Sequence, residues 1–323
     1  MGYQPNVVAR SMVTGHSHTL GLVVADIENP FFARVTRGFT DVAGQSGFDV
    51  IVLNTDEEIT AEASALRVLL QRRVDGIAVA PASVTRIGHL REAKDSGVPL
   101  VLLDRRIPRF GVDVVGIDNR AAAFVAVTRL VEQGHTRIAM VSGGAGDQGA
   151  HPAAHVLTTG QDRIHGYRDA LAAARLGDGE RYLRITSFRQ ESAREATVDL
   201  LTGAVRPTAI FCSDSVLTLG VLRAVQSIGA VIPSDVSVVG FDDADWMNVV
   251  CPPLSVVDQP AYDIGAVAAS RLVKRVRGST ARTQILRLPT TFISRGSVGP
   301  PSSRRLNPSR SCEAAISTRP TQT

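Results

Sequence analysis

The sequence predicts an α/β protein built from two doubly wound parallel sheets. Three observations support this class. Short runs rich in Val, Ile and Leu alternate with longer amphipathic segments from Leu20 onward, glycines and a proline mark the boundaries between them, and the alternation is interrupted once, at residues 142–161. Strand–helix–strand repeats form right-handed crossovers, so the strands on either side of the interruption are expected to form separate parallel sheets.

The predicted strands are short and continuously apolar, as in sheets whose two faces are both covered by helices. Those before the interruption are Leu20–Ala25, Asp49–Leu53, Gly76–Ala80, Pro99–Leu103, Val112–Ile117 and Ile138–Ser142. Those after it are Thr208–Cys212, Val236–Phe241, Ile285–Leu288 and Thr291–Ser294.

The segments between these runs have the character of helices. They are Phe31–Ser46, Ala61–Arg72, Asn119–Glu132, Asp162–Ala174, Ser192–Thr202, Ser215–Ile228 and Ala261–Arg277. Asn29 and Pro30 suit the start of the first helix, because proline is favoured in a first turn. Gly97 and Gly229 stand where a helix ends in a left-handed residue.

The predicted organisation has two lobes that exchange chain segments. The first lobe is expected at about 20–141 with 260–278, and the second at about 142–259 with 279–298. Residues 1–19 are expected to be a linker, and the Ser-, Pro- and Arg-rich residues 299–323 a disordered basic tail.

Composition excludes several protein classes. With 44% hydrophobic and 20% charged residues, the 323-residue chain is an ordinary globular protein. No apolar stretch is long enough to cross a membrane, and the first one is too short for a secretory signal, so a cytoplasmic protein is expected. Most of the net charge of +4 lies in the tail, which leaves no basic patch for nucleic acid on the body.

The residues that follow the predicted strands, most of them polar, stand where open α/β sheets bind ligands. These residues are Asp26, Ala80-Pro81, Asp104-Arg105, Asp118-Asn119, Ser142-Gly143, Ser213-Asp214 and Asp242-Asp243. Carboxylates accept hydrogen bonds from vicinal hydroxyls, and the nearby Phe31 and Phe32 suit the C–H face of a sugar. The alternative is that each acid caps the helix that follows it.

Catalytic and metal sites are not predicted. The glycine-rich residues 142–146 lack the lysine of a phosphate-binding loop, and Cys212 lies within an apolar strand, as a buried structural thiol does. The three cysteines and the loop histidines His16, His18, His151 and His155 have no metal-ligand spacing. No cofactor and no enzymatic activity are therefore expected.

Several motifs together resemble the lactose/galactose-repressor (LacI/GalR) family of bacterial transcription regulators. In order they are Met1–Met12 (MGYQPNVVARSM), Gly21–Phe32 (GLVVADIENPFF), Arg73–Ile77, Gly97–Val101, Gly134–Ile138, Arg206–Cys212, Ile232–Asp243 (IPSDVSVVGFDD) and Pro253–Pro260 (PLSVVDQP). The resemblance extends from about Gly2 to Val298.

This resemblance implies a type I periplasmic-binding-protein-like core, in which two lobes close over a small effector such as a sugar or nucleoside, and a homodimer. Position by position, it assigns effector contacts to Phe31, Phe32, Arg163, Phe188, Asp214 and Asp242. Asp214 stands where the family usually has asparagine, and Ser215 where it usually has aspartate. The alternative for Arg163 and Asp242 is a structural ion pair, and the alternative for Phe31 and Phe32 is a place in the hydrophobic core.

The resemblance also implies a role for the first residues. Met1–Met12 matches the hinge segment that binds the minor groove of operator DNA, with Met12 as an apolar wedge and Arg10 near phosphate. The family's helix-turn-helix head does not precede it in this sequence. We therefore expect effector binding and dimerisation, with little specific DNA affinity in this polypeptide.

Two other classes of function stay open at this point. A sugar-binding protein of a transport system would share the core, but it needs a signal peptide and has no use for a hinge. An enzyme on a doubly wound fold would need a catalytic set of side chains that the sequence does not show.

Overall fold

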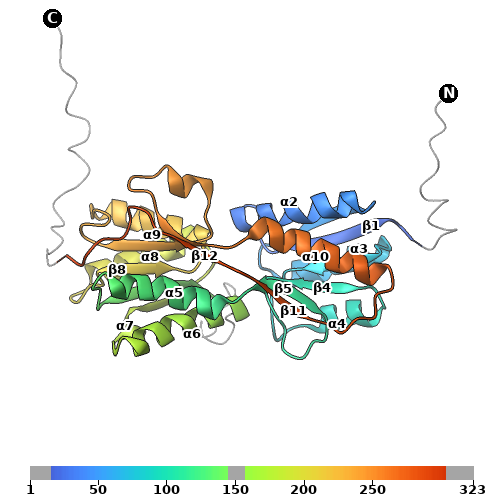
Figure 1. Cartoon of the computed structure of the whole chain (residues 1–323), viewed down its shortest axis with the longest axis horizontal. Coiled ribbons are helices and arrows are strands. Elements are labelled where there is room, and N and C mark those ends of the chain that lie inside the picture. Colours follow the sequence, from blue (N-terminus) through green and yellow to red (C-terminus); the bar gives the residue numbers. More distant parts are fainter. Residues whose placement is uncertain (1–15, 145–156, 303–323) are drawn as a thin grey trace, which may run out of the picture. The chain divides into compact units, whose positions relative to one another are not determined.

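The computed structural model describes residues 16–144 and 157–302. They form two compact units. The first unit contains the described residues up to Asp118 together with Leu157–Thr159 and Gln259–Thr290, and the second contains the remainder. Each unit is a six-stranded sheet with helices on both faces (Figure 1).

The sheet of the first unit has the strand order β11-β5-β4-β3-β1-β2, and all of its neighbouring strands are parallel. The strands are β1 (Thr19–Val24), β2 (Asp49–Asn54), β3 (Gly76–Val79), β4 (Leu100–Leu103), β5 (Asp113–Ile117) and β11 (Ile285–Leu288). The central strands β3 and β4 are entirely buried, which explains their unbroken apolar sequences.

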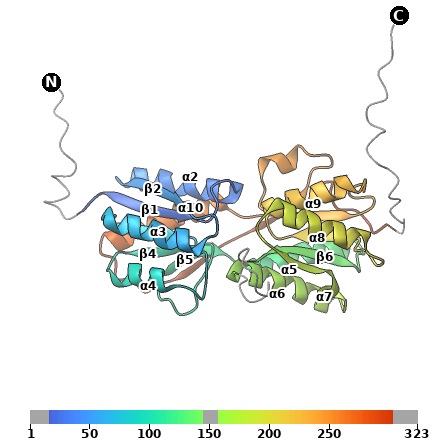
Figure 2. The ribbon, with the colours of Figure 1, turned by 180° about the vertical axis from the view of Figure 1, so that it is seen from behind.

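In the described part of the unit, four helices cover this sheet: α2 (Pro30–Gln45), α3 (Ile59–Gln71), α4 (Gly88–Asp95) and α10 (Ala261–Val276). Helices α2 and α10 pack together, as do α3 and α4. Figure 1 shows α10 in front of the sheet, and the reverse view in Figure 2 shows α3 and α4 in front of it. Apolar side chains from α3, α4 and the central strands form one buried cluster.

The sheet of the second unit has the order β12-β10-β9-β8-β6-β7. Its strands are β6 (Ile138–Gly143), β7 (Leu183–Thr186), β8 (Ala209–Cys212), β9 (Ser237–Phe241), β10 (Ser255–Asp258) and β12 (Thr291–Ile293). Among these described strands, β10 and β12 pair antiparallel and the other neighbours are parallel.

The helices of the second unit are α5 (Asn119–Glu132), α6 (Thr158–Ala173), α7 (Gly179–Tyr182), α8 (Gln190–Thr202) and α9 (Ser215–Ser227), with a short 3-10 helix η2 (Asp245–Asn248). Helices α8 and α9 pack on each other and cover one face of the sheet, where their apolar side chains join those of β8 and β9 in a buried cluster. None of the described helices is long and apolar enough to cross a membrane.

The predicted fold class, two mainly parallel sheets flanked by helices, is confirmed. The two units differ from the expected lobes in three segments, the shortest of which is Leu157–Thr159, a part of the first unit. Helix α5 and strand β6 belong to the second unit because β6 pairs with β7 and β8. Strand β11 belongs to the first unit because it pairs with β5.

Some elements were not predicted, namely α4, α7, β7, β10 and η2. Helix α6 also begins at Thr158 rather than Asp162, inside the segment expected to interrupt the pattern. The expected linker at 1–19 and tail at 299–323 lie largely outside the described residues.

Candidate functional site

Both sheets reverse their strand order at the strand next to one edge, β1 in the first unit and β6 in the second. In the first unit, β2 lies on one side of β1 and β3 on the other. In the second unit, β7 lies on one side of β6 and β8 on the other. Loops leave the carboxyl ends of such neighbouring strands in opposite directions, which makes room for a ligand. The residues that follow these strands are therefore the candidates for binding.

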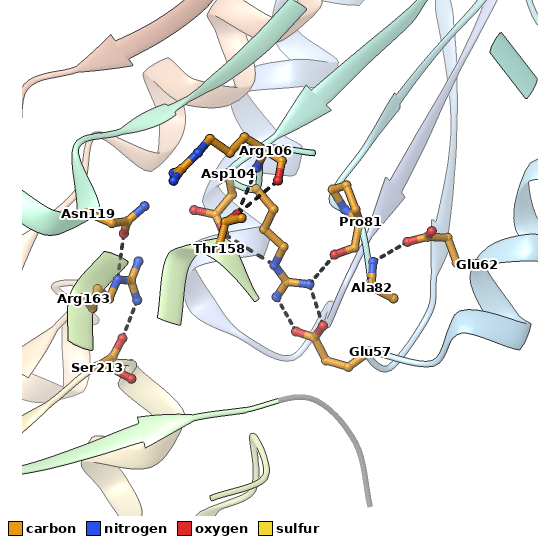
Figure 3. A network of polar contacts seen from close by, with 11 residues as sticks. Glu57, Glu62, Pro81, Ala82, Asp104, Arg106, Asn119, Thr158, Arg163 and Ser213 are labelled. Atoms are coloured by element: carbon orange, nitrogen blue, oxygen red, sulfur yellow. Dashed lines mark hydrogen bonds and ion pairs between the residues drawn. The ribbon is translucent and has the colours of Figure 1, made fainter. Parts of the chain in front are cut away.

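In the second unit, Arg163 on α6 is buried and held on three sides. Its Nε donates to Asn119 Oδ1 at 2.7 Å, and its Nη1 donates to the carbonyl oxygen of Ser213 (Figure 3). The guanidinium carbon lies 3.8 Å from the centroid of the Phe241 ring, at the end of β9. A cation over an aromatic face is attracted by the ring quadrupole. These contacts fix Arg163 at the carboxyl edge of the sheet.

Asp242 follows Phe241 and so lies at the same edge. Its φ of +67° is in the left-handed region, which Asp and Asn adopt more readily than most residues. Its N–H donates to Val257 O at 2.8 Å, and its carbonyl accepts from Ala244 N at 2.9 Å. The backbone on both sides is thus anchored, and the side chain of Asp242 is placed beside the strand ends.

Asp214 follows β8 and caps α9. Its Oδ1 accepts hydrogen bonds from Val216 N at 2.7 Å and Leu217 N at 3.2 Å. One carboxylate oxygen thus has the capping role that the sequence left open as an alternative. Asp214 is buried, and its place after β8 also puts it at the edge of the sheet.

Phe188, in the loop after β7, covers the end of β6. A methyl group added to Gly143 would lie 2.2 Å from the Phe188 ring, so the ring rests directly on the glycine backbone. The N–H of Gly143 donates to Ser213 Oγ at 3.3 Å. The half-buried Phe188 ring therefore lies next to the reversal point of the second sheet.

In the first unit, Phe31 and Phe32 form the first turn of α2, where Asn29 caps the helix by accepting from Phe31 N at 3.0 Å. Both rings are buried and pack edge to face with centroids 5.0 Å apart. The Phe32 ring lies 5.9 Å from the guanidinium carbon of Arg105.

Arg105 follows β4 and is buried at the carboxyl edge of the first sheet. Its Nη1 and Nη2 donate to the two carboxylate oxygens of Glu57 at 2.6 and 2.5 Å, and Nη1 also donates to Pro81 O at 2.9 Å. Burial opposes the charge of Arg105, but the carboxylates of Glu57, Asp104 and Glu62 together outweigh burial and raise the pKa of the guanidinium.

A second buried carboxylate, that of Glu62, fixes the loop after β3 that contains Pro81. Glu62 on α3 accepts from Ala82 N at 2.5 Å and contacts His89 Nε2 on α4. Arg105 thus holds the carbonyl of Pro81, and Glu62 holds the next N–H (Figure 3). The backbone after β3 is rigidly positioned beside the strand ends.

The described residues contain no cluster of three or more His, Cys, Asp or Glu side chains that would hold a metal. Cys212 is buried within β8, and burial raises the pKa of its thiol to about 12, so the thiolate nucleophile is disfavoured.

The sequence prediction named six effector contacts, and each lies in the described part of the chain, on the edges or helix starts described above. Arg10 and Met12 lie outside the described residues. The prediction did not name Glu57, Asn119, Ser213 or Phe241 as site residues. Asn119 and Ser213 follow strands and were identified as strand-end residues only, whereas Glu57 lies in the turn after β2 and gave no sequence signal.

A family model for the periplasmic binding protein-like domain matches residues 127–298. Catabolite control protein A of Priestia megaterium is 35% identical over 289 residues, 90% of this chain and 84% of that protein. The ribose operon repressor of Halalkalibacterium halodurans is 32% identical over 91% of this chain and 84% of its own length.

Solved structures of transcription regulators are also similar to this chain. The LacI family transcriptional regulator of Enterococcus faecium, determined with bound ribose, aligns with a TM-score of 0.74 and 29% identity, covering 87% of this chain and 99% of that one. CcpA of Lactococcus lactis aligns with a TM-score of 0.77 and 26% identity over 87% and 98%. Because the related proteins are regulators of transcription, the chain is not an enzyme. The chain belongs to the LacI/GalR family of transcriptional regulators.

Proposed function

We propose that this regulator binds a small hydroxylated metabolite, of the sugar class, at the carboxyl edges of its sheets. The observation that carries the proposal is the buried Arg163, which is fixed by Asn119, Ser213 and Phe241 beside the acidic strand end at Asp242. A preorganised arginine and a carboxylate supply a donor and an acceptor for neighbouring hydroxyls without first having to be ordered.

The proposed effector contacts are assigned on each unit by itself. On the second unit they are Arg163, Asp242, Asp214 and the ring of Phe188, which offers an apolar face to C–H groups. On the first unit they are Phe31 and Phe32 at the start of α2.

A pentose is the first effector to try. One relative is a ribose operon repressor, and one structural neighbour was determined with bound ribose. The acidic strand ends in this chain are consistent with such a polyhydroxylated ligand, because ionised carboxylates accept two or more hydrogen bonds from hydroxyls.

As a regulator, the protein is proposed to be a cytoplasmic homodimer that couples effector binding to operator binding. Such coupling is reciprocal and typically amounts to ~1–3 kcal/mol. Arg10 and Met12 are proposed to contact the minor groove. Their assignment rests on the family resemblance of the hinge segment.

The effector site is tested by thermal unfolding with a panel of D-ribose, other pentoses and hexoses, and adenosine. A sugar that binds the folded state raises its melting temperature. We expect Asp242→Asn to weaken binding about 10-fold or more, the value of one charge-assisted hydrogen bond. Asparagine keeps the left-handed backbone that alanine would strain.

Asp245→Asn is the matched control, since Asp245 is exposed on η2 only three residues further along. It should respond to the sugar as the wild type does. Equal sugar-induced shifts in the wild type and Asp242→Asn would remove Asp242 from the site. Absence of any shift across the panel would contradict the proposed effector class.

A further inference from the structure

The bidentate face of Arg105 is already filled by a carboxylate of the chain itself. A guanidinium fork matches the two oxygens of a carboxylate or phosphate, and such pairs are among the strongest hydrogen bonds in proteins. Here both Nη atoms of Arg105 donate to Glu57, and Nη1 also donates to Pro81 O. In the first unit, the arginine at the sheet edge is thus paired with an internal anion.

Glu57 is held in this position by its backbone. Asp56 and Glu57 have φ values of +50° and +63°, so two consecutive residues other than glycine adopt the left-handed region. Such conformations cost free energy and persist where the surroundings enforce them. The N–H of Glu57 donates to Ala25 O at 3.1 Å, which ties the turn to the end of β1.

A second carboxylate, that of Asp104, lies near Arg105 and carries the same negative charge as Glu57. Asp104 precedes Arg105, and its Oδ2 lies 3.7 Å from Arg105 Nε. The Asp104 and Glu57 side chains are only 8% and 17% exposed. An anionic ligand approaching Arg105 would have to displace Glu57 and lie between two carboxylates in a poorly solvated place, where like charges repel strongly.

We propose that Glu57 determines effector specificity: by occupying the fork of Arg105, it restricts the regulator to uncharged hydroxylated effectors and excludes their phosphate esters. This inference rests on the proposed function, because it names the charge class of the effector bound at the same strand ends. It goes beyond that function in assigning a selective role to a residue that is itself not proposed to bind the sugar.

The test compares D-ribose, D-ribose 5-phosphate and inorganic phosphate by thermal unfolding and calorimetric titration of the full chain. In Glu57→Gln, the two Nη atoms of Arg105 no longer face a carboxylate, while Asp104 stays beside Nε. We expect this variant to bind D-ribose 5-phosphate about 10- to 100-fold more tightly than the wild type does, as one or two charge-assisted hydrogen bonds become available.

Glu58→Gln is the matched control. Glu58 is exposed, caps α3 without a side-chain hydrogen bond, and loses the same charge one residue further on. It should bind the phosphate ester no better than the wild type. In Glu57→Gln combined with Arg105→Gln, the gain should disappear, which would show that Arg105 is the group that captures the phosphate.

Each result decides the inference. It is overturned if the wild type binds D-ribose 5-phosphate as tightly as Glu57→Gln does, if neither binds it, or if the gain survives loss of Arg105. A lower melting temperature of Glu57→Gln does not obscure the answer, because the readout is the ligand-induced shift within each variant. A wild type that ignores every neutral sugar while Glu57→Gln gains phosphate binding would refute the proposed effector class but keep the role of Glu57.

Discussion

At the scale of single residues, the strand-end rule located the edge of each sheet but not the partners of its side chains. Arg163 and Asp214 were both predicted as ligand contacts. The structure shows Arg163 held by Asn119 and Ser213, and Asp214 occupied in part by capping α9. Glu57 was beyond prediction, because its role depends on a left-handed turn that brings it to Arg105, a residue 48 positions away.

His135 makes a pH prediction at this scale. It is buried between α5 and β6, where its Nε2–H donates to Gly299 O at 2.9 Å and its Nδ1 pairs with Thr208 Oγ1 at 2.9 Å. Burial lowers the pKa of His135 below its ordinary 6.5, although the bond to Gly299 opposes this. The unfolded chain therefore binds a proton at a higher pH than the folded protein does.

The stabilising contribution of neutral His135 is therefore fully present above pH 6.5 and is lost as the pH falls through the lowered pKa of the folded state. Urea unfolding at pH 7.5 and 5.5 measures the effect. We expect the free energy of unfolding to fall less over this range in His135→Gln than in the wild type. His165→Gln, which changes an exposed histidine on α6, should behave as the wild type. A slope unchanged by His135→Gln would contradict the assignment.

At the scale of elements, the sequence predicted the strands that are continuously apolar and missed a strand and a helix that have few buried residues. Strands β3 and β4 were found because every residue is buried. Strand β7 was missed because it lies at a sheet edge, is only half-buried and carries Arg184. Helix α4 was missed because only Leu90 and Ala93 of its residues are buried, too few to show a helical period.

The packing of α2 against α10 depends on glycine. A methyl group at Gly38 would lie 1.9 Å from Tyr262 O, and one at Gly265 would lie 1.9 Å from Val35 O, so the two helices approach backbone to backbone. Composition and periodicity did not predict this contact, because a glycine within a helical sequence does not indicate which other helix packs against it.

We expect Gly38→Ala to lower the free energy of unfolding by about 1–3 kcal/mol through overpacking. Gly44→Ala in the same helix has open space around it and should raise the free energy of unfolding by about 0.5–1 kcal/mol, because alanine suits helices better than glycine. Urea unfolding of both variants checks the pair. Equal effects of the two substitutions would show that α2 and α10 do not pack as described.

At the scale of the whole molecule, the alternation of strands and helices was sufficient to predict two parallel sheets. The exact assignment of segments was not predictable, because it depends on strand pairing between distant segments, such as β11 with β5 and β12 with β10. The strand order reverses at β1 in the first unit and at β6 in the second. The central proposal about function is that the ligand binds at the carboxyl edges of the sheets.

Hydrogen–deuterium exchange, with and without the panel sugar that gives the largest thermal shift, tests that claim most directly. Binding at the strand ends predicts slower exchange of amides in the loops after the strands, near Phe32, Arg105, Asp214 and Asp242. The opposite edges, near Asp75 and Arg137, should exchange as before. Protection confined to those opposite edges, with no change after the strands, would contradict the account.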